Sequence, residues 1–158
     1  MQKIIAICGI KNSGKTTLTS KLVAHYSSLG KKVAVIKHDG HDFSCDLPGT
    51  DSFRMTEAGA YGTAVFSDYR IFIHKIGTKE REQMLIKQFP EADIIFLEGF
   101  KDSEYQKIEV VRSERSHSPV SNPKGRFLIA TDLPLENFKE KAKNINDIIG
   151  ISKEIDLI

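Results

Sequence analysis

Several features that would assign the chain to a specialised class are missing from its sequence. It has only two cysteines, Cys8 and Cys45, too few for the disulfide framework of a small secreted domain. No apolar run reaches the length of a membrane-spanning helix, and the first run, residues 3–8, is too short for the core of a signal peptide. The net charge is only +2, so charge gives no reason to expect nucleic-acid or membrane binding. These absences favour a cytoplasmic protein with reduced thiols.

Length and composition predict one globular domain. The chain has 158 residues, enough for a single domain over residues 1–158 and too few for two of ordinary size. Hydrophobic residues make up 40% and charged residues 28%, which supplies both a core and a hydrated surface. There is no internal repeat and no stretch with the composition of an interdomain linker.

The apolar runs predict a sheet of parallel strands. Five short runs are typical of buried strands: KIIAIC, KKVAVIK, DIIFLEGF, KIEVVR and RFLIAT. Between the first two, Leu18, Leu22 and Tyr26 mark one face of a helix that should end at Gly30. A strand–helix–strand unit of this kind requires a right-handed crossover and therefore parallel pairing.

The remaining segments predict smaller elements. SFRMTEAGA can form a short helix, and AVF and IFIHKI on either side of SDYR predict a β-hairpin. Thr78 can cap a helix that runs to about Phe89 and turns Met84, Leu85 and Phe89 inward. One or two short helices are expected between Leu135 and Gly150.

The stretch GIKNSGKT, residues 9–16, matches the phosphate-loop pattern G-x-x-x-x-G-K-[ST] in full, with a strand before it and a helix after it. Such a loop directs backbone N–H groups and the positive end of the helix dipole toward phosphate oxygens. Lys15 should reach the β- and γ-phosphates, the Thr16 hydroxyl should coordinate Mg²⁺, and Thr17 can contact the α-phosphate. The residues expected to bind nucleotide are Gly9, Asn12, Ser13, Gly14, Lys15, Thr16 and Thr17.

The expected fold is a three-layer α/β P-loop NTPase domain with a mostly parallel central sheet and a small hairpin extension.

A P-loop protein also needs an acid near Mg²⁺, and DIIFLEG contains two. The loop lies beyond the carboxyl ends of the parallel strands, so Glu98 is at the correct end of its strand and Asp93 at the wrong one. We therefore predict Lys15 and Glu98 as catalytic residues and Thr16 and Glu98 as Mg²⁺ ligands. Gly99 suits a close backbone approach to the γ-phosphate. The alternative for Glu98 is an ordinary carboxylate at a strand end.

The polar stretch from His38 to Asp51 has three interpretations. Its histidines, carboxylates and Cys45 are suitable transition-metal ligands, although their spacing matches no standard zinc pattern. It can equally be a solvated loop. Its position after the second strand also suits a segment that lies over the phosphates and changes order with the nucleotide. In that case the residues that could contact Mg²⁺, phosphate or a second substrate are Lys37, Asp39, Asp46, Asp51 and Arg54.

With these parts assembled, the chain resembles the MobB family, the molybdopterin-guanine dinucleotide biosynthesis proteins B. The resemblance runs in order through GIKNSGKTTL, VIKHDGHDF, DLPGTDSFRMTEAGA, DIIFLEGFK and KIEVVR. It implies a GTP-binding protein, usually a homodimer, that uses Mg²⁺ and has weak GTPase activity. It also implies an accessory role, in which the protein helps a partner guanylyltransferase to attach GMP to molybdopterin.

Two positions depart from related patterns. Dimeric ATPases of the MinD type place a lysine directly after the first glycine of the loop, where this chain has Ile10, and Lys11 comes one position too late. No N-K-x-D guanine-reading motif is present. The best substitute is Asp132, whose carboxylate could accept hydrogen bonds from guanine N1 and N2. The alternative is a simple turn residue before Pro134.

Two other functions share the phosphate loop. A small-molecule kinase would need an arginine-rich lid. Only Arg112 and Arg115 lie near a suitable loop, which disfavours the kinase without excluding it. The second alternative, a nucleotide-switched module for metal delivery, would bind metal through His38, His41 and Cys45. The hairpin is the expected dimer contact in the family interpretation, because its apolar residues exceed what one sheet edge must bury.

Overall fold

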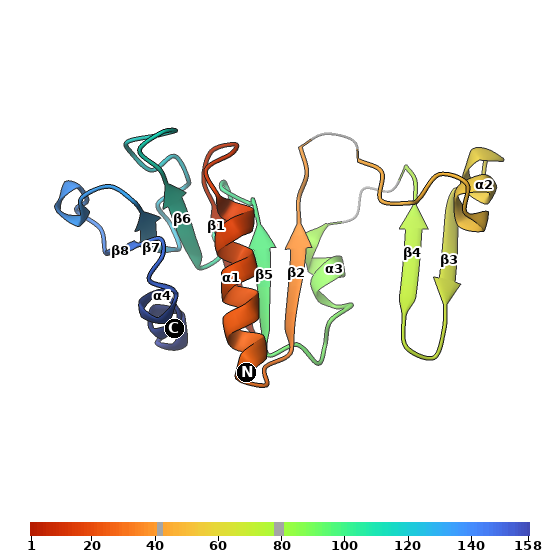
Figure 1. Cartoon of the computed structure of the whole chain (residues 1–158), viewed down its shortest axis with the longest axis horizontal. Helices are drawn as coiled ribbons and strands as arrows, with labels where there is room; N and C mark the ends of the chain where they lie inside the picture. The colour runs from red at the N-terminus through yellow and green to blue at the C-terminus, as the bar shows by residue number, and fades with distance from the viewer. Residues whose placement is uncertain (41–42, 78–80) are drawn as a thin grey trace. The chain divides into compact units, whose positions relative to one another are not determined.

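The computed structural model describes residues 1–40, 43–77 and 81–158, and the chain forms two compact units (Figure 1). Unit 1 comprises residues 1–38 and 82–158, and unit 2 comprises residues 39–81. Unit 2 is thus one continuous segment between the two parts of unit 1. No helix in the described parts of the chain has both the length and the apolar character needed to cross a bilayer.

Unit 1 is built on a six-stranded sheet in which every pairing is parallel. The strand order is β2-β5-β1-β6-β7-β8, so β1 lies between β5 and β6. The strands are β1 (Lys3–Cys8), β2 (Val33–Lys37), β5 (Ile94–Glu98), β6 (Lys107–Val111), β7 (Arg126–Thr131) and β8 (Ala142–Asn144). The predicted α/β fold class is confirmed, and the first five of these strands occupy the predicted runs.

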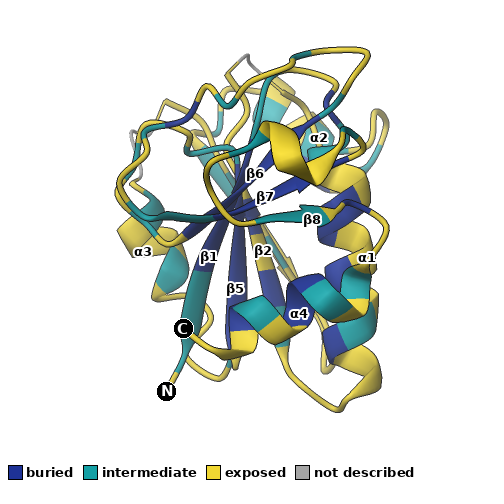
Figure 2. Cartoon of the chain, turned by 90° about the vertical axis from the view of Figure 1, so that its left-hand side faces the viewer, coloured by how far each residue is buried: buried dark blue, intermediate teal, exposed yellow. Residues whose placement is uncertain are grey.

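Two helices cover one face of this sheet. Helix α1 (Lys15–Ser28) buries Leu18, Leu22 and Tyr26 against the strands, and Gly30 follows its end with a φ of +75°. Helix α4 (Ile148–Asp156) buries Ile151 and Ile155 in the same core. Figure 2 shows the buried residues of both helices and of the central strands.

The opposite face is covered mainly by irregular chain, and here one prediction was wrong. The helix expected up to Phe89 is only α3 (Glu82–Ile86), and Thr78 lies outside the described residues. Met84, Leu85 and Phe89 are exposed, and Ile86 is the helix residue that packs against this core. The short i→i−3 bonds of residues 88 and 89 close the helix just before Pro90, since a residue preceding proline is driven out of helical geometry.

The C-terminal segment also differs from the prediction. Between residues 135 and 150 the chain forms a 3₁₀ turn, η1 (Leu135–Asn137), and then strand β8, before α4 begins at Ile148. Strand β8 has the sequence Ala-Lys-Asn, which carries no strand signal, and it forms because its backbone pairs with β7 at the sheet edge. Asp147 then caps α4 by accepting a hydrogen bond from the Gly150 N–H at 2.9 Å.

Unit 2 consists of helix α2 (Asp51–Glu57) and an antiparallel hairpin of β3 (Gly62–Phe66) and β4 (Ile71–Lys75). The hairpin extension is thereby confirmed. The stretch DLPGTDS forms the turn that starts α2, because Thr50 caps the helix by accepting from the Phe53 N–H. The Asp46 carboxylate accepts from the Thr50 and Ser52 hydroxyls and stabilises the same turn.

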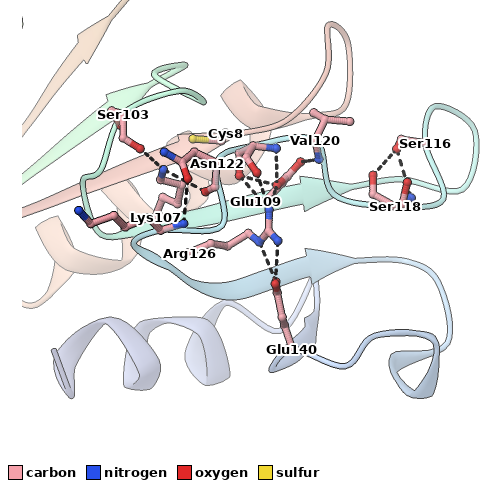
Figure 3. A network of polar contacts seen from close by, with 12 residues as sticks. Cys8, Ser103, Lys107, Glu109, Ser116, Ser118, Val120, Asn122, Arg126 and Glu140 are labelled. Carbon is pink, nitrogen blue, oxygen red and sulfur yellow. Dashed lines mark hydrogen bonds and ion pairs between the residues drawn. The ribbon is translucent and has the colours of Figure 1, made fainter.

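A buried polar network holds the irregular chain on the second face of unit 1 (Figure 3). Ile108 and Val110 of β6 point into the helix-covered core, so the intervening Glu109 points to the other face. The Glu109 carboxylate is almost fully buried and accepts from the N–H groups of Val120 and Ser121. It also forms an ion pair with Arg126 at 3.0 Å, and Arg126 in turn binds Glu140.

Lys107, also on β6, completes this network. It is fully buried, and its ammonium donates hydrogen bonds to the carbonyl oxygens of Ser103 and Asn122. Lys107 and Glu109 thus supply hydrogen-bond partners for four backbone groups of the irregular segments beside β6, at residues 103, 120, 121 and 122.

We predict that Glu109→Ala destabilises the chain strongly. It leaves the buried Arg126 guanidinium without one partner and the N–H groups of Val120 and Ser121, one of them buried, without an acceptor. The free energy of unfolding should fall by about 3–5 kcal/mol. Urea denaturation followed by circular dichroism measures this. Glu104→Ala is the matched control, because its ion pair with Lys124 is on the surface and should contribute less than about 1 kcal/mol. Equal effects of the two substitutions would contradict the role given to the network.

Candidate functional site

The predicted phosphate loop joins β1 to α1 at the carboxyl end of the central strand. Three of its residues have positive φ, Gly9 at 139°, Asn12 at 60° and Gly14 at 95°. A Cβ atom on Gly9 would lie 2.6 Å from the Val110 carbonyl oxygen and 2.8 Å from the Ser13 hydroxyl. Only glycine fits at this position, because both its φ and its surroundings exclude a side chain. The loop therefore has the tight curvature that the sequence pattern predicts.

The Ser13 side chain is buried in this loop with an unsatisfied hydroxyl. Its oxygen has no hydrogen-bond partner among the described residues, although Ser13 is only 1% exposed. A buried polar atom without a partner is rare in proteins and is often found where a ligand binds. The loop thus offers a bound group a donor in addition to the backbone N–H groups.

Lys15 is folded back over the loop. Its ammonium donates hydrogen bonds to the carbonyl oxygens of Gly9, at 3.2 Å, and Ile10, at 2.7 Å. Burial lowers the pKa of Lys15, and the nearby Glu98 carboxylate acts in the opposite direction. The cation therefore lies at the loop, as the sequence predicts, and its present partners are neutral carbonyl groups that an anion can replace.

Thr16 and Glu98, the two predicted Mg²⁺ ligands, are in direct contact. The Thr16 hydroxyl donates a hydrogen bond of 2.7 Å to Oε1 of Glu98, which is 5% exposed. The ammonium of Lys37 lies 3.9 Å from the same oxygen. A hydroxyl and a carboxylate oxygen are the hard ligands that Mg²⁺ prefers. The residues present therefore fit a nucleotide with its magnesium ion.

Asp93 is at the other end of β5, as expected. Its carboxylate accepts a hydrogen bond of 2.8 Å from the Lys32 N–H, at the start of the neighbouring strand. This contact stabilises the beginning of β2 and β5 and has no relation to the phosphate loop.

A groove of about 450 Å³ adjoins the Thr16–Glu98 pair. Its walls come from α1, the edge strand β2 and the end of β5. The lining residues are Thr16, Thr19, Ser20, Val23, Ala24, Val35, Lys37 and Glu98.

The turn after Glu98 is shaped by two residues with positive φ, Gly99 at 108° and Phe100 at 52°. The Gly99 N–H donates to the Ile7 carbonyl, and the Cys8 thiol donates to the Gly99 carbonyl at 2.9 Å. These bonds join the end of β5 to the end of β1. They place Gly99 beside the phosphate loop. Two other residues expected to bind nucleotide, Asn12 and Thr17, are exposed.

Asp132 lies at the same edge of the sheet, after β7, and its carboxylate is already engaged. It accepts from Arg112 Nε at 2.9 Å, from the Ser113 N–H at 2.8 Å and from the Ser113 hydroxyl at 3.1 Å. Burial acts to raise the pKa of Asp132, but the bonds from Ser113 and Arg112 outweigh it and hold the pKa below its ordinary value. Sequence reasoning missed this pair. Arg112 and Asp132 each follow directly on a strand, and those strands are neighbours, which was the available signal.

The segment from His38 to Asp51 gives no support to the metal interpretation. Among the described residues, no group of three or more His, Cys, Asp or Glu side chains is placed to hold a metal ion. His41 and Asp42 lie outside the described residues. His38 contacts the Phe100 ring, and Cys45 is exposed.

Comparisons with known proteins agree on one family. The model of the MobB family, described as molybdopterin guanine dinucleotide synthesis protein B, matches residues 4–132. The chain is 34% identical over 159 residues to the molybdopterin-guanine dinucleotide biosynthesis adapter protein of Escherichia coli K12, covering 96% of this chain and 90% of that protein. It is also 34% identical over 136 residues to the adapter protein of Haemophilus influenzae, covering 84% and 76% respectively.

Solved structures show the same fold. The crystal structure of Bacillus subtilis MobB matches with a TM-score of 0.75 at 23% identity, over 99% of this chain and 98% of that one. A MobB homologue from Bacillus stearothermophilus matches with a TM-score of 0.71 at 22% identity, over 98% and 99%.

We predict that Cys8 is chemically inert in the folded chain. Burial raises its pKa to about 12, so at pH 8 only about one thiol in 10,000 is the reactive thiolate. In a Cys45→Ser chain, a thiol reagent such as DTNB should react only after urea is added. The matched Cys8→Ser chain should react at once through the exposed Cys45. Rapid labelling of the folded Cys45→Ser chain would show that Cys8 is accessible.

Proposed function

The chain belongs to the MobB family, and from this membership we propose that it is a GTP-binding accessory protein of molybdopterin guanine dinucleotide biosynthesis. It binds GTP with Mg²⁺, hydrolyses it weakly, and assists a partner guanylyltransferase in attaching GMP to molybdopterin. The observation that carries the proposal is the Thr16–Glu98 hydrogen bond beside a phosphate loop whose buried Ser13 hydroxyl has no partner among the described residues.

The residues of the loop have distinct tasks in this proposal. The backbone N–H groups of residues 9–17 and the start of α1 bind the phosphates, and the Ser13 hydroxyl gains the partner that the described residues do not supply. Lys15 exchanges its two carbonyl partners for phosphate oxygens, which is favourable because the acceptor is then charged as well as the donor. Bound Mg²⁺ would neutralise phosphate charge, and Thr16 and Glu98 would hold it.

Weak hydrolysis is what the loop composition favours. Ile10 supplies no cation at the position after the first glycine, and the Lys11 side chain begins one residue too late. Stabilisation of the phosphate charge therefore depends mainly on Lys15 and the metal. Slow hydrolysis suits an accessory protein whose nucleotide-bound form must persist until a partner binds it.

The proposal includes a homodimer that forms through the hairpin of unit 2. Strands β3 and β4 alone make a two-stranded sheet, which is rarely stable without an apolar surface packed on it. Three large apolar side chains on one face of the two strands are exposed: Phe66, Ile71 and Ile73. A second copy of the chain is the partner that we expect for this surface.

We predict that Lys15→Ala abolishes useful GTP binding. Removal of the ammonium eliminates at least two charge-assisted hydrogen bonds, which should weaken binding at least about 100-fold. Isothermal titration calorimetry with GTP and Mg²⁺ measures this. Lys11→Ala, on the exposed part of the same loop, should bind within a few-fold of the wild-type affinity. Retained micromolar binding by Lys15→Ala would mean that the nucleotide binds elsewhere.

We predict that Glu98→Gln separates binding from magnesium dependence. The amide keeps the shape of the side chain but is a poor Mg²⁺ ligand, so GTP affinity without metal should change less than about threefold while phosphate release falls about tenfold or more. Phosphate release measured across a range of Mg²⁺ concentrations tests this. Asp93→Asn, which alters the other acid of the same segment, should leave the magnesium dependence unchanged. Wild-type turnover of Glu98→Gln at saturating Mg²⁺ would contradict the metal role.

A further inference from the structure

We propose that Arg112 is a further nucleotide-binding residue, which Asp132 orients so that its guanidinium contacts a phosphate group held by the loop. This inference rests on the proposed function, since it requires a nucleotide in the phosphate loop. It also changes the role of Asp132 from a group that reads guanine to one that positions an arginine.

The sheet places Arg112 beside the phosphate loop. Strand β6 pairs with β1 up to the partners Cys8 and Glu109, where β1 ends, and β6 runs on beside the loop to Val111, directly before Arg112. A Cβ atom built on Gly14 would lie 3.4 Å from Arg112 Nη1, and no other heavy atom of the described residues outside its immediate neighbourhood lies within 4 Å of it. The guanidinium is therefore the side-chain group that faces the loop at Gly14.

Asp132 fixes the orientation of this guanidinium through one nitrogen. Arg112 Nε donates to Oδ2 of Asp132, while the Ser113 N–H and hydroxyl hold the same carboxylate in place. Among the described residues, neither terminal nitrogen of Arg112 donates a hydrogen bond. The end of the guanidinium thus keeps donors for a ligand, in the planar arrangement that suits phosphate oxygens.

The backbone around Arg112 is also fixed by hydrogen bonds. The Arg112 carbonyl accepts hydrogen bonds from the N–H groups of Arg115, at 2.9 Å, and Ser116, at 2.8 Å. Further along the same segment, Glu109 binds the N–H groups of residues 120 and 121 (Figure 3). An arginine on such an anchored segment loses little conformational entropy when it binds an anion.

The surrounding charge identifies the ligand as an anion. Lys15 lies over the loop, and Arg112, although paired with Asp132, presents a second cationic donor group at Gly14. In contrast, the Asp132 carboxylate already accepts three hydrogen bonds, so accepting from both guanine N1 and N2 would require at least one of them to break. A phosphate contact of Arg112 needs no bond in this cluster to break.

Nucleotide binding by five variants tests the inference, with GTP and ITP as the probes because ITP lacks the 2-amino group that a carboxylate would bind. Arg112→Met should weaken both nucleotides equally, by about 10- to 30-fold, the effect of one or two charge-assisted hydrogen bonds. Arg112→Lys should recover affinity to within about fivefold of wild type, since it restores the cation without the fork. Arg115→Met, on the same turn, is the matched control and should bind like wild type.

Asp132→Asn and its combination with Arg112→Met separate positioning from base reading. If Asp132 acts through Arg112, Asp132→Asn weakens GTP and ITP equally and adds nothing to Arg112→Met. A fall in the preference for GTP over ITP, or additive losses in the double variant, would overturn the inference. The inference would also be overturned if Arg112→Met bound nucleotide like wild type while Lys15→Ala lost binding. That result would leave the proposed function intact. Failure of the wild-type chain to bind either nucleotide would overturn both.

Discussion

The parallel pairing of β1 with β5 on one side and with β6 on the other is the constraint on which the site depends. Parallel strands end at the same edge of a sheet, so this order brings together segments that are far apart in sequence. The phosphate loop follows β1, Glu98 ends β5, and Arg112 follows β6. Each of these groups acts on the loop only because its strand is a direct neighbour of the central strand.

The two faces of this sheet are covered by different physical means. On one face, α1 and α4 bury aliphatic side chains and satisfy their own backbone hydrogen bonds. On the other, irregular chain crosses β6, and buried Lys107 and Glu109 supply the partners that its backbone needs. Buried charges are costly unless they are fully paired, which makes this arrangement specific for one path of the chain. That path sets the position of the segment after Arg112.

Much of the fold and part of the site could be predicted from local sequence. The strand KIIAIC, the loop GIKNSGKT and the helix after it are encoded within a few residues of one another, because the periodicity of apolar residues and the glycine positions are local properties. Strand polarity alone placed Glu98 at the loop and Asp93 away from it. Strand β8 could not be predicted in this way, since Ala-Lys-Asn becomes a strand only through an exposed edge of β7. The helix expected up to Phe89 ends at Ile86, which packs on the core, because the turn before Pro90 cannot continue as a helix.

The sequence by itself determined that the chain has a phosphate loop on a parallel α/β sheet and carries the motifs of the MobB family. Gly9, Gly14, a lysine and a threonine suffice to predict the loop, because its geometry depends on backbone conformation within eight residues. The apolar runs predict the sheet, and the longer motifs carry the family resemblance. Only the tertiary structure decided what lies around the loop. It joined Thr16 to Glu98 and Arg112 to Asp132, pairs separated by 82 and 20 residues. Contacts of this kind arise from strand order and register, which no local pattern of residues encodes.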